Sequence, residues 1–354
     1  MVLWMLSDRS GCGVYRCIVP ALGLKDRGHT DSNFCERKHM GPQAGGKLDF
    51  SVLDEVSAVV LQRPGAPILR QWMVEIQRRG LPLLVEFDDD VWHIGKHNPA
   101  YGYWQQRPVR SLFLSALDRA DAILVSTPAL AEQVRVHTGR SDAVVAYNHL
   151  NDAVWGDDVL RHYTRKPDPM GRVVIGWQGS PTHEQDFGVV VGALRRVLDA
   201  YPHAVLRLFG SVPSCVRGNI IPQRFEYAKG VPFEAYPLML KGMQFDIMLA
   251  PLAPSVFNES KSNIRWLEAG ALSLPTVASD VGPYRAITHG DTGLVARTED
   301  EWVEHLSALI ESEDLRQRIG AAAFETVWRD WGHDRVEVWA SALKRVWPTA
   351  TAAS

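Results

Sequence analysis

The chain has few cysteines, and its hydrophobic runs are short. Its four cysteines are Cys12, Cys17, Cys35 and Cys215. They lack the paired spacing of zinc ligands, and the sequence shows no secretory leader, so we expect reduced thiols in a cytoplasmic protein. The apolar run at 1–6 ends at Ser7, far short of the ~18 residues of a membrane span. We therefore expect no transmembrane segment, and a first strand in this place.

The chain also has no excess of positive charge. It contains 38 Lys and Arg residues against 41 Asp and Glu residues, for a net charge of −3. A general nucleic-acid binder would carry a broad basic surface, so we expect nucleic acid as a partner only if a modified base is the acceptor of a reaction. The sequence shows no amphipathic membrane anchor and no repeat at solenoid spacing.

Predicted strands and helices alternate along the whole chain. Its 354 residues are about twice a usual domain, and 46% hydrophobic with 22% charged residues is typical of a globular protein. The pattern predicts an α/β protein with two Rossmann-like, doubly wound domains that face each other across a cleft. Residues 31–54 are polar and lack periodicity, so we expect an irregular connection there.

Composition also suggests where the domains begin and end. We predict a first domain at 1–156, a charged, proline-containing linker at 157–170, and a second domain at 171–327. The aromatic-rich segment 328–354 is predicted to form a helix that packs back on the first domain.

A polar loop leads into a helix in the second half of the chain. Ser262 or Asn263 can cap this helix. Ser260, Lys261 and Ser262 lie at its start, where free N–H groups and the helix dipole attract an anion such as phosphate. Glu268, on the second turn, is within reach of a ribose attached to that phosphate. The alternative is a capped surface helix with a solvated Lys and Glu.

Glycines follow the first predicted strand. Gly11 and Gly13 would let backbone N–H groups approach an anion closely, with Arg16 nearby. The full dinucleotide fingerprint is missing, because Arg16 stands three residues after Gly13, where the fingerprint has its last glycine. The alternative is a tight turn that needs glycine only for its geometry.

A similar loop opens the second predicted domain. Gly179 and Ser180 follow a predicted strand and can donate N–H and O–H hydrogen bonds to a diphosphate. His183 can reach the same ligand, whereas the alternative for a single histidine is a structural role.

Three carboxylates, Asp88, Asp89 and Asp90, follow another predicted strand. Clustered carboxylates can bind a divalent cation, as an Asp-x-Asp motif does in glycosyltransferases of the GT-A class. Alternatively, Asp88 or Asp89 caps the next helix or pairs with Arg107 or Arg110.

A third interpretation gives this triplet a part in the reaction. Asp88 and Asp89 would then bind the acceptor or act as a general base together with His93.

The segment from Asp246 to Tyr284 resembles the nucleotide-sugar site of family 4 glycosyltransferases, which have two Rossmann-like domains in the GT-B arrangement. That family carries a Glu, seven residues and a second Glu. Here Glu268 matches the second Glu, while Ser260 occupies the place of the first and Glu259 lies one place away. A more local resemblance, at 88–98, is to small stand-alone glycosyltransferases of bacteria and their phages.

The resemblance implies a metal-independent, retaining glycosyltransferase, such as a hexosyltransferase, that uses a nucleotide-diphosphate sugar as donor and no other cofactor. The acceptor would be a protein, a glycan or another hydroxyl-bearing molecule. The predicted catalytic residues are Lys261, Asp88, Asp89 and His93. The predicted donor-binding residues are Gly11, Gly13, Arg16, Gly179, Ser180, His183, Ser260, Ser262, Asn263 and Glu268.

Two other functions fit the same sequence. A phosphorylase or an epimerase can have the same architecture, because a fold does not fix the reaction. A module that binds a nucleotide or glycan without turnover is suggested by Ser260 in place of the first Glu.

Overall fold

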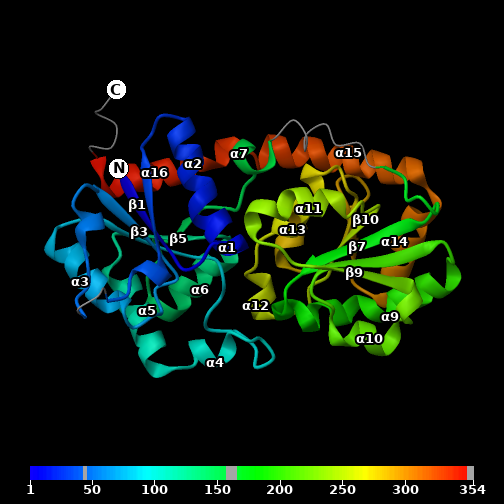
Figure 1. The fold of residues 1–354 in the computed structure, drawn as a ribbon, viewed down its shortest axis with the longest axis horizontal. Helices are drawn as coiled ribbons and strands as arrows, with labels where there is room; N and C mark the ends of the chain where they lie inside the picture. Colours follow the sequence, from blue (N-terminus) through cyan, green and yellow to red (C-terminus); the bar gives the residue numbers. More distant parts are fainter. Residues whose placement is uncertain (43–45, 157–165, 349–354) are drawn as a thin grey trace.

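The computed structural model describes residues 1–42, 46–156 and 166–348. Two domains lie side by side, each with a parallel six-stranded sheet between helices (Figure 1). The predicted α/β fold with two Rossmann-like domains is confirmed. Most of the predicted linker, at 157–165, and the tail at 349–354 lie outside the described residues.

The first sheet has the strand order β2-β1-β3-β4-β5-β6, and all its neighbouring strands are parallel. Its strands are β1 (Val2–Leu6), β2 (Ser32–Glu36), β3 (Ala58–Gln62), β4 (Leu83–Phe87), β5 (Ala122–Val125) and β6 (Val144–Val145). The strands β1, β3 and β4 are buried over their whole length, as expected for a sheet that helices cover on both faces.

The strand β2 lies within the segment that we expected to be irregular, so that prediction was wrong. It pairs with β1 at the edge of the sheet, and only Cys35 in it is buried. An edge strand with exposed side chains needs no hydrophobic run, because the hydrogen bonds of its neighbour hold it in place.

The second sheet has the order β12-β11-β10-β7-β8-β9 and is also parallel. Its strands are β7 (Val173–Gly179), β8 (Ala204–Gly210), β9 (Phe225–Lys229), β10 (Ile247–Ala250), β11 (Thr276–Ser279) and β12 (Leu294–Ala296). In both sheets the strand order reverses beside the first strand, and loops at such a reversal commonly bind ligands in α/β proteins.

Helices cover both sheets. Those of the first domain are α1 (Gly11–Gly13), α2 (Val19–Asp26), α3 (Leu69–Arg78), α4 (Tyr101–Trp104), α5 (Arg107–Arg119), α6 (Pro128–Thr138) and α7 (Asp152–Trp155), with a π-helical turn at Val14–Ile18 between α1 and α2. Those that follow are α9 (Glu184–Ala200), α10 (Ser214–Asn219), α11 (Tyr236–Gly242), α12 (Val256–Glu259), α13 (Ile264–Ala271), α14 (Glu299–Glu311), α15 (Glu313–Asp330) and α16 (Glu337–Val346).

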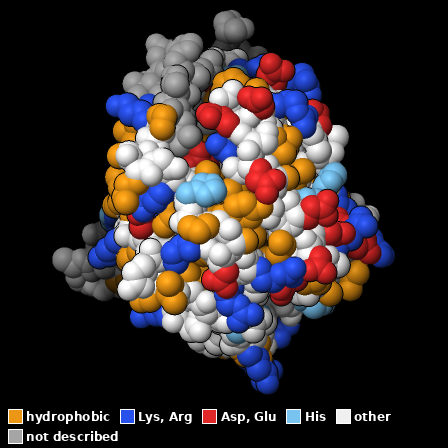
Figure 2. Space-filling view, turned by 90° about the vertical axis from the view of Figure 1, so that its right-hand side faces the viewer, with side chains coloured by type: hydrophobic (Ala, Val, Ile, Leu, Met, Phe, Trp, Pro, Cys, Tyr) orange, Lys and Arg blue, Asp and Glu red, His pale blue; other side chains and the backbone are white. Residues whose placement is uncertain are grey.

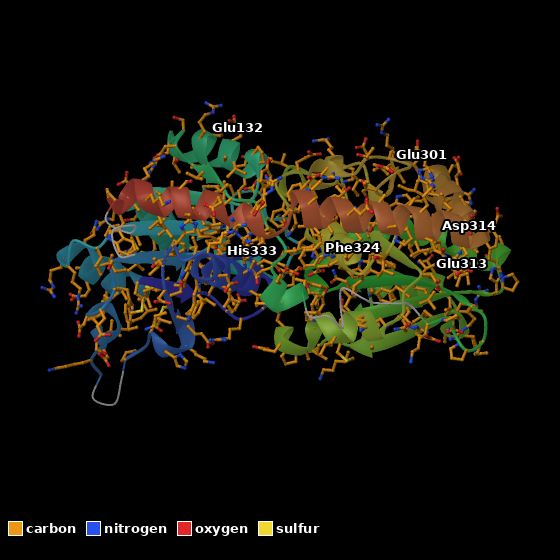
Figure 3. All side chains as sticks on the ribbon, turned by 90° about the horizontal axis from the view of Figure 1, so that it is seen from above. Glu132, Glu301, Glu313, Asp314, Phe324 and His333 are labelled. Carbon is orange, nitrogen blue, oxygen red and sulfur yellow. The ribbon has the colours of Figure 1, made fainter. Side chains whose placement is uncertain are left out.

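The last two helices connect the domains. Seen from above, α15 lies along the second domain and α16 continues over the first, with Phe324 on α15 and His333 between the two helices (Figure 3). Trp339 of α16 is buried against Trp4 of β1, with ring centroids 5.4 Å apart. Burial of such large aromatic side chains stabilises the return of the chain to the first domain.

The surface that Figure 2 presents, at the end of the second domain, carries acidic and basic side chains interspersed. Within the described part of the chain, no helix is both long enough and apolar enough to cross a membrane.

Candidate functional site

A cleft of about 640 Å³ lies between the domains, lined by loops that follow strands of both sheets. Ligand pockets usually enclose about 300–1,000 Å³, so the cleft has room for a nucleotide sugar. The predicted site residues that line it are Gly11, Asp88, Asp89, Gly179, Ser180, His183, Lys261, Ser262 and Glu268. The loop after β4 and the short helix α4 extend from the first domain toward α12 of the second (Figure 1).

Lys261 joins the two domains across this cleft. It lies between α12 and α13, and its Nζ is 2.9 Å from Oδ1 of Asp89, two residues after the end of β4. Burial favours the neutral amine, but the carboxylate of Asp89 outweighs it and raises the pKa of Lys261 above its ordinary value. Lys261 is therefore a cation at neutral pH, as anion binding requires.

Arg63 is a cleft residue that we did not predict. It follows β3, and its Nε and Nη2 lie 2.9 and 2.5 Å from Oδ1 of Asp88, while Nη2 is also 2.7 Å from Oδ2 of Asp89. Its φ of 45° places a non-glycine residue in the left-handed region, and such strain is common at functional sites. The carboxylates thus pair with Arg63 and Lys261, and the suggested pairing with Arg107 or Arg110 was wrong.

His93 does not join Asp88 and Asp89, contrary to our expectation. Its Nδ1 is 2.8 Å from Oδ2 of Asp90, and the backbone N–H groups of Trp92 and His93 donate to Oδ1 of the same carboxylate. Asp90 therefore caps this turn and holds His93 within it. His93 lies outside the lining of the cleft.

Arg16 is buried completely, so the prediction that it contacts the donor was wrong. Its Nε is 2.5 Å from Oε1 of Glu86. Burial raises the pKa of Glu86 to about 7, because the positive charge of Arg16 offsets only part of the effect of burial. Arg16 also donates to Oδ1 of Asn148 at 3.0 Å, and Nδ2 of Asn148 donates to Oγ of Ser262 at 2.8 Å. Arg16 is thus linked to the predicted phosphate loop through Asn148.

Gly13 supports the alternative of a tight turn. A Cβ atom on Gly13 would lie 1.8 Å from the backbone oxygen of Asp8, so no other residue fits there. Gly11 has open space around its Cα and does line the cleft. Of the two glycines, only Gly11 is therefore placed to face a ligand.

Ser260 and Asn263 are buried beside the cleft rather than in its lining. The backbone oxygen of Ser260 accepts a hydrogen bond of 2.8 Å from Oγ1 of Thr127 in the first domain. Asn263 is the N-cap residue of α13, but its side chain makes no capping hydrogen bond. The predicted N-cap position is therefore confirmed at Asn263, whose backbone oxygen accepts from the N–H of Trp266 at 2.9 Å, while its side chain leaves the N–H groups of Ile264 and Arg265 without a cap.

Glu268 is almost fully buried at the base of the cleft, with 4% of its surface exposed. Its Oε1 accepts a hydrogen bond from Tyr15 of the first domain at 2.9 Å, and its Oε2 accepts from Gln178 at 2.9 Å and from Tyr236 at 2.7 Å. Burial raises the pKa of Glu268 to about 7, although both tyrosine hydrogen bonds and Arg265 favour the carboxylate. A carboxylate accepts about four hydrogen bonds, so little capacity remains for a ligand.

Arg265 is a second cation of this segment that we did not predict. It lies in the first turn of α13, four residues after Lys261, and lines the cleft although only 5% of it is exposed. Its Nε has no hydrogen-bond partner among the described residues. A buried donor without a partner is costly, and an anion in the cleft would satisfy it. Its place in the first turn of a helix that follows a polar loop was the signal for this position.

His183 also lines the cleft, after the loop of Gly179 and Ser180. Burial lowers its pKa to about 4, helped by Arg265, although Asp186 acts in the opposite direction. His183 is therefore neutral at pH 7. Its Nδ1, 2.8 Å from Oδ2 of Asp186, carries the proton, which leaves Nε2 as a hydrogen-bond acceptor.

Aromatic rings from the end of β8 and from the segment after β9 also line the cleft. The ring of Tyr236 stacks on Phe209, with centroids 5.6 Å apart, and on Phe233, with centroids 5.4 Å apart. Gly210 and Gly230 lie beside them in the lining. Flat apolar rings next to residues without side chains are suited to a planar group such as a nucleobase.

A metal site is not evident in the cleft. No group of three or more His, Cys, Asp or Glu side chains among residues 1–42, 46–156 and 166–348 is arranged to hold an ion. The two carboxylates nearest the opposite domain are already paired with Arg63 and Lys261. Cations of the protein thus occupy the positions at which a divalent ion would bind these carboxylates.

Comparison with known families gives a match to the second half of the chain. A family model described as glycosyl transferase-like matches residues 191–340, a range that contains the loop of Lys261 and the helix of Glu268. No curated protein matches the chain.

Solved structures share the fold at low sequence identity. HepE (Alr3699) of Anabaena, in complex with UDP and glucose, has a TM-score of 0.69 and 13% identity, over 97% of this chain and 99% of that one. Sucrose-phosphate synthase of Thermosynechococcus elongatus has a TM-score of 0.65 and 13% identity, over 100% of this chain and 99% of that one.

A third structure is S. aureus TarM in complex with Fondaparinux, alpha-GlcNAc-glycerol and UDP, with a TM-score of 0.60 and 12% identity over 80% of this chain. This chain spans 55% of the TarM chain. The fold shared with HepE and sucrose-phosphate synthase is the GT-B fold, with two Rossmann-like domains across a cleft.

Proposed function

We propose that the chain is a glycosyltransferase that transfers a sugar, a hexose by preference, from a nucleotide-diphosphate sugar to a hydroxyl group of an acceptor. The observation that carries this proposal is the pair of cations at the start of α13. Lys261, in the loop before α13, and Arg265, in its first turn, both line the cleft, and Nε of Arg265 is buried without a partner among the described residues. Two cations near a helix start that has no side-chain cap suit a diphosphate.

The proposal assigns each part of the donor to residues that line the cleft. The diphosphate would lie on Lys261, Arg265 and the first turn of α13, and the nucleobase against the ring of Tyr236. Glu268, between these two places, would hold the ribose. As the bond to the sugar breaks, the leaving diphosphate gains negative charge, which fixed cations in a partly buried cleft stabilise without reorganising.

The acceptor would bind on the side of the first domain. Asp88 and Asp89 face the cleft there, and Nε2 of His183 can accept a hydrogen bond from a hydroxyl of the transferred sugar. The resemblance to family 4 supports retention of the anomeric configuration, which the NMR spectrum of the first-formed product would test.

The complexes of similar structures suggest which donors and acceptors to test first. The HepE complex contains UDP and glucose, and the TarM complex contains UDP, Fondaparinux and alpha-GlcNAc-glycerol. UDP-glucose and UDP-N-acetylglucosamine are therefore our first donors, with glycans as the first acceptors.

The proposal is tested by binding and turnover together. We expect one nucleotide sugar in a panel to raise the melting temperature, since a ligand that binds only the folded protein stabilises it. We also expect release of the nucleoside diphosphate when this sugar is mixed with a pool of acceptors. If a nucleotide sugar raises the melting temperature but no acceptor leads to release of the nucleoside diphosphate, the result favours the binding module. If no nucleotide sugar in the panel raises the melting temperature, the proposal is rejected.

Turnover is expected to survive an excess of chelator. The cations Lys261 and Arg265 supply the positive charge that a divalent ion would bring to the diphosphate, so activity in EDTA should stay within about twofold of the untreated protein. The measurement is nucleotide release with and without EDTA, and an enzyme known to need Mn²⁺ serves as the control for chelation. Loss of activity that Mn²⁺ or Mg²⁺ restores would contradict the metal-independent mechanism.

A further inference from the structure

Two polar groups of the first domain occupy the atoms that the proposed donor needs in the second domain. Asp89 accepts the hydrogen bond of Lys261 at 2.9 Å, and the hydroxyl of Tyr15 donates to Glu268 at 2.9 Å. The carboxylate of Asp89 gives Lys261 a negatively charged oxygen, as a phosphate would. The hydroxyl of Tyr15 donates a hydrogen bond to Glu268, as a ribose hydroxyl would. The first domain thus presents both contacts of a nucleotide.

We propose that Asp89 is an intramolecular competitor of the donor, which holds Lys261 until a diphosphate displaces it and so determines how strongly anionic ligands bind. This inference rests on the proposed function, because it assigns the diphosphate to Lys261. A neutral ligand, such as a nucleoside, does not compete with Asp89. Because of the carboxylate of Asp89, only a ligand with enough negative charge on its phosphates can displace Asp89 from Lys261 and bind.

The surroundings of Asp89 make this exchange feasible. Its other oxygen, Oδ2, is 2.7 Å from Nη2 of Arg63, so Asp89 keeps a cation as partner after Lys261 has left. The side chain of Asp89 is 28% exposed, and water can solvate the oxygen that is released. The charge of Asp89 is thus not left buried without a partner, which would oppose the displacement.

Asp88 provides a matched control. It lies next to Asp89 and also pairs with Arg63, through Oδ1 at 2.9 and 2.5 Å, but its carboxylate has no bond to Lys261. Asp88→Asn and Asp89→Asn each remove one negative charge from the same side of the cleft, and only Asp89→Asn frees Lys261.

Calorimetry with inorganic pyrophosphate, UDP and uridine tests the inference. We expect Asp89→Asn to tighten binding of pyrophosphate and UDP about fivefold, as for loss of a partly exposed ion pair, and to leave uridine unchanged. Asp88→Asn should have less than half of this effect. In the background of Lys261→Ala, the gain from Asp89→Asn should disappear, because the two residues then no longer interact.

The outcomes separate this inference from the proposed function. If wild-type protein binds neither UDP nor pyrophosphate, or if Lys261→Ala leaves both affinities unchanged, the diphosphate site itself is wrong. If Lys261→Ala weakens binding but Asp89→Asn does not tighten it, only the competition is wrong. If Asp88→Asn and Asp89→Asn tighten binding equally, the effect comes from the loss of any negative charge on this side of the cleft, and the competition by Asp89 is also wrong.

A second measurement covers the case in which Asp89→Asn does not fold. In a crystal structure of the wild-type protein with UDP, we expect Lys261 on a phosphate oxygen and more than about 4 Å from Asp89, which is beyond ion-pair distance. A bound UDP with the contact between Asp89 and Lys261 still intact would overturn the inference.

Discussion

Replacing Lys261 with alanine is expected to lower turnover of the nucleotide sugar about 100- to 1000-fold. Removing one preorganised donor from a charge that develops in the transition state has this effect in other enzymes. The variant also removes the charge-assisted contact of the ammonium group with the diphosphate, while Asp89 keeps Arg63 as its cation at 2.7 Å. Affinity for UDP should therefore fall about tenfold or more. Nucleotide release at saturating donor gives the turnover, and calorimetry gives the affinity.

Two further variants show whether the charge itself matters. Lys344→Ala removes an exposed lysine of α16 and should change neither quantity. Lys261→Arg keeps the charge and should recover part of the turnover. Unchanged turnover and affinity in Lys261→Ala, with a melting temperature close to that of wild type, would exclude Lys261 from the site and with it the proposed diphosphate place.

The sequence was informative where one short segment forms the site. Ser262, Lys261 and Glu268 lie within one loop and the helix that follows it, so their common position at the cleft depends on local structure alone. The alternation of strands and helices likewise predicted the two sheets, because each buried strand is a short hydrophobic run between helical patterns.

Residues whose role depends on a distant partner were not predictable in this way. In the sequence, Arg16 looked like a loop residue near glycines. In the structure, Glu86 of β4 lies 2.5 Å from Nε of Arg16, and the two residues form a buried ion pair. Arg63 reaches Asp88 because β3 and β4 pair side by side, and no local pattern encodes this pairing. His93 carried a plausible chemistry, but the turn formed by Asp90 directs it away from the cleft.

Of the two positions of the Glu motif that resembles family 4, the structure places only the second in the lining of the cleft. Glu259, one place from the position of the first Glu, pairs with Arg285 at 2.9 and 3.1 Å and lies outside the lining of the cleft. Ser260, at that position, is buried. The second Glu, Glu268, is therefore the carboxylate of this motif that lines the cleft, and Arg265 adds a cation close to it.

Replacing Glu268 with glutamine is expected to remove most of the preference for a ribonucleotide over its 2′-deoxy counterpart. Hydrogen bonds to a charged group contribute about 1.5–3 kcal/mol, so UDP should lose about tenfold or more in affinity, and 2′-deoxy-UDP distinctly less because it lacks one of the hydroxyls. Calorimetry with both ligands measures this difference. Glu259→Gln, which changes a partly exposed carboxylate of the same segment outside the lining of the cleft, should affect neither ligand.

The pH dependence gives an independent test of the same residue. Because burial raises the pKa of Glu268 to about 7, its carboxylate is mostly protonated at pH 6 and mostly ionised at pH 8. Only the ionised form accepts hydrogen bonds from both ribose hydroxyls, so affinity for UDP-glucose should rise between pH 6 and 8. The phosphates of this diester carry no second proton with a pKa near 6, unlike those of UDP, and do not titrate in this range.

Stability should change with pH in the opposite direction. The pKa of Glu268 in the folded protein, about 7, is above the ordinary value of 4.5, so the folded state binds a proton more tightly than the unfolded state does. This contribution to stability is complete below pH 4.5 and is lost as the pH rises through about 7. In Glu268→Gln the rise in UDP-glucose affinity should be absent, and the loss of melting temperature between pH 5 and 8 should be smaller. A rise in affinity that persists in Glu268→Gln would show that another group titrates, and would leave Glu268 without a role at the ribose.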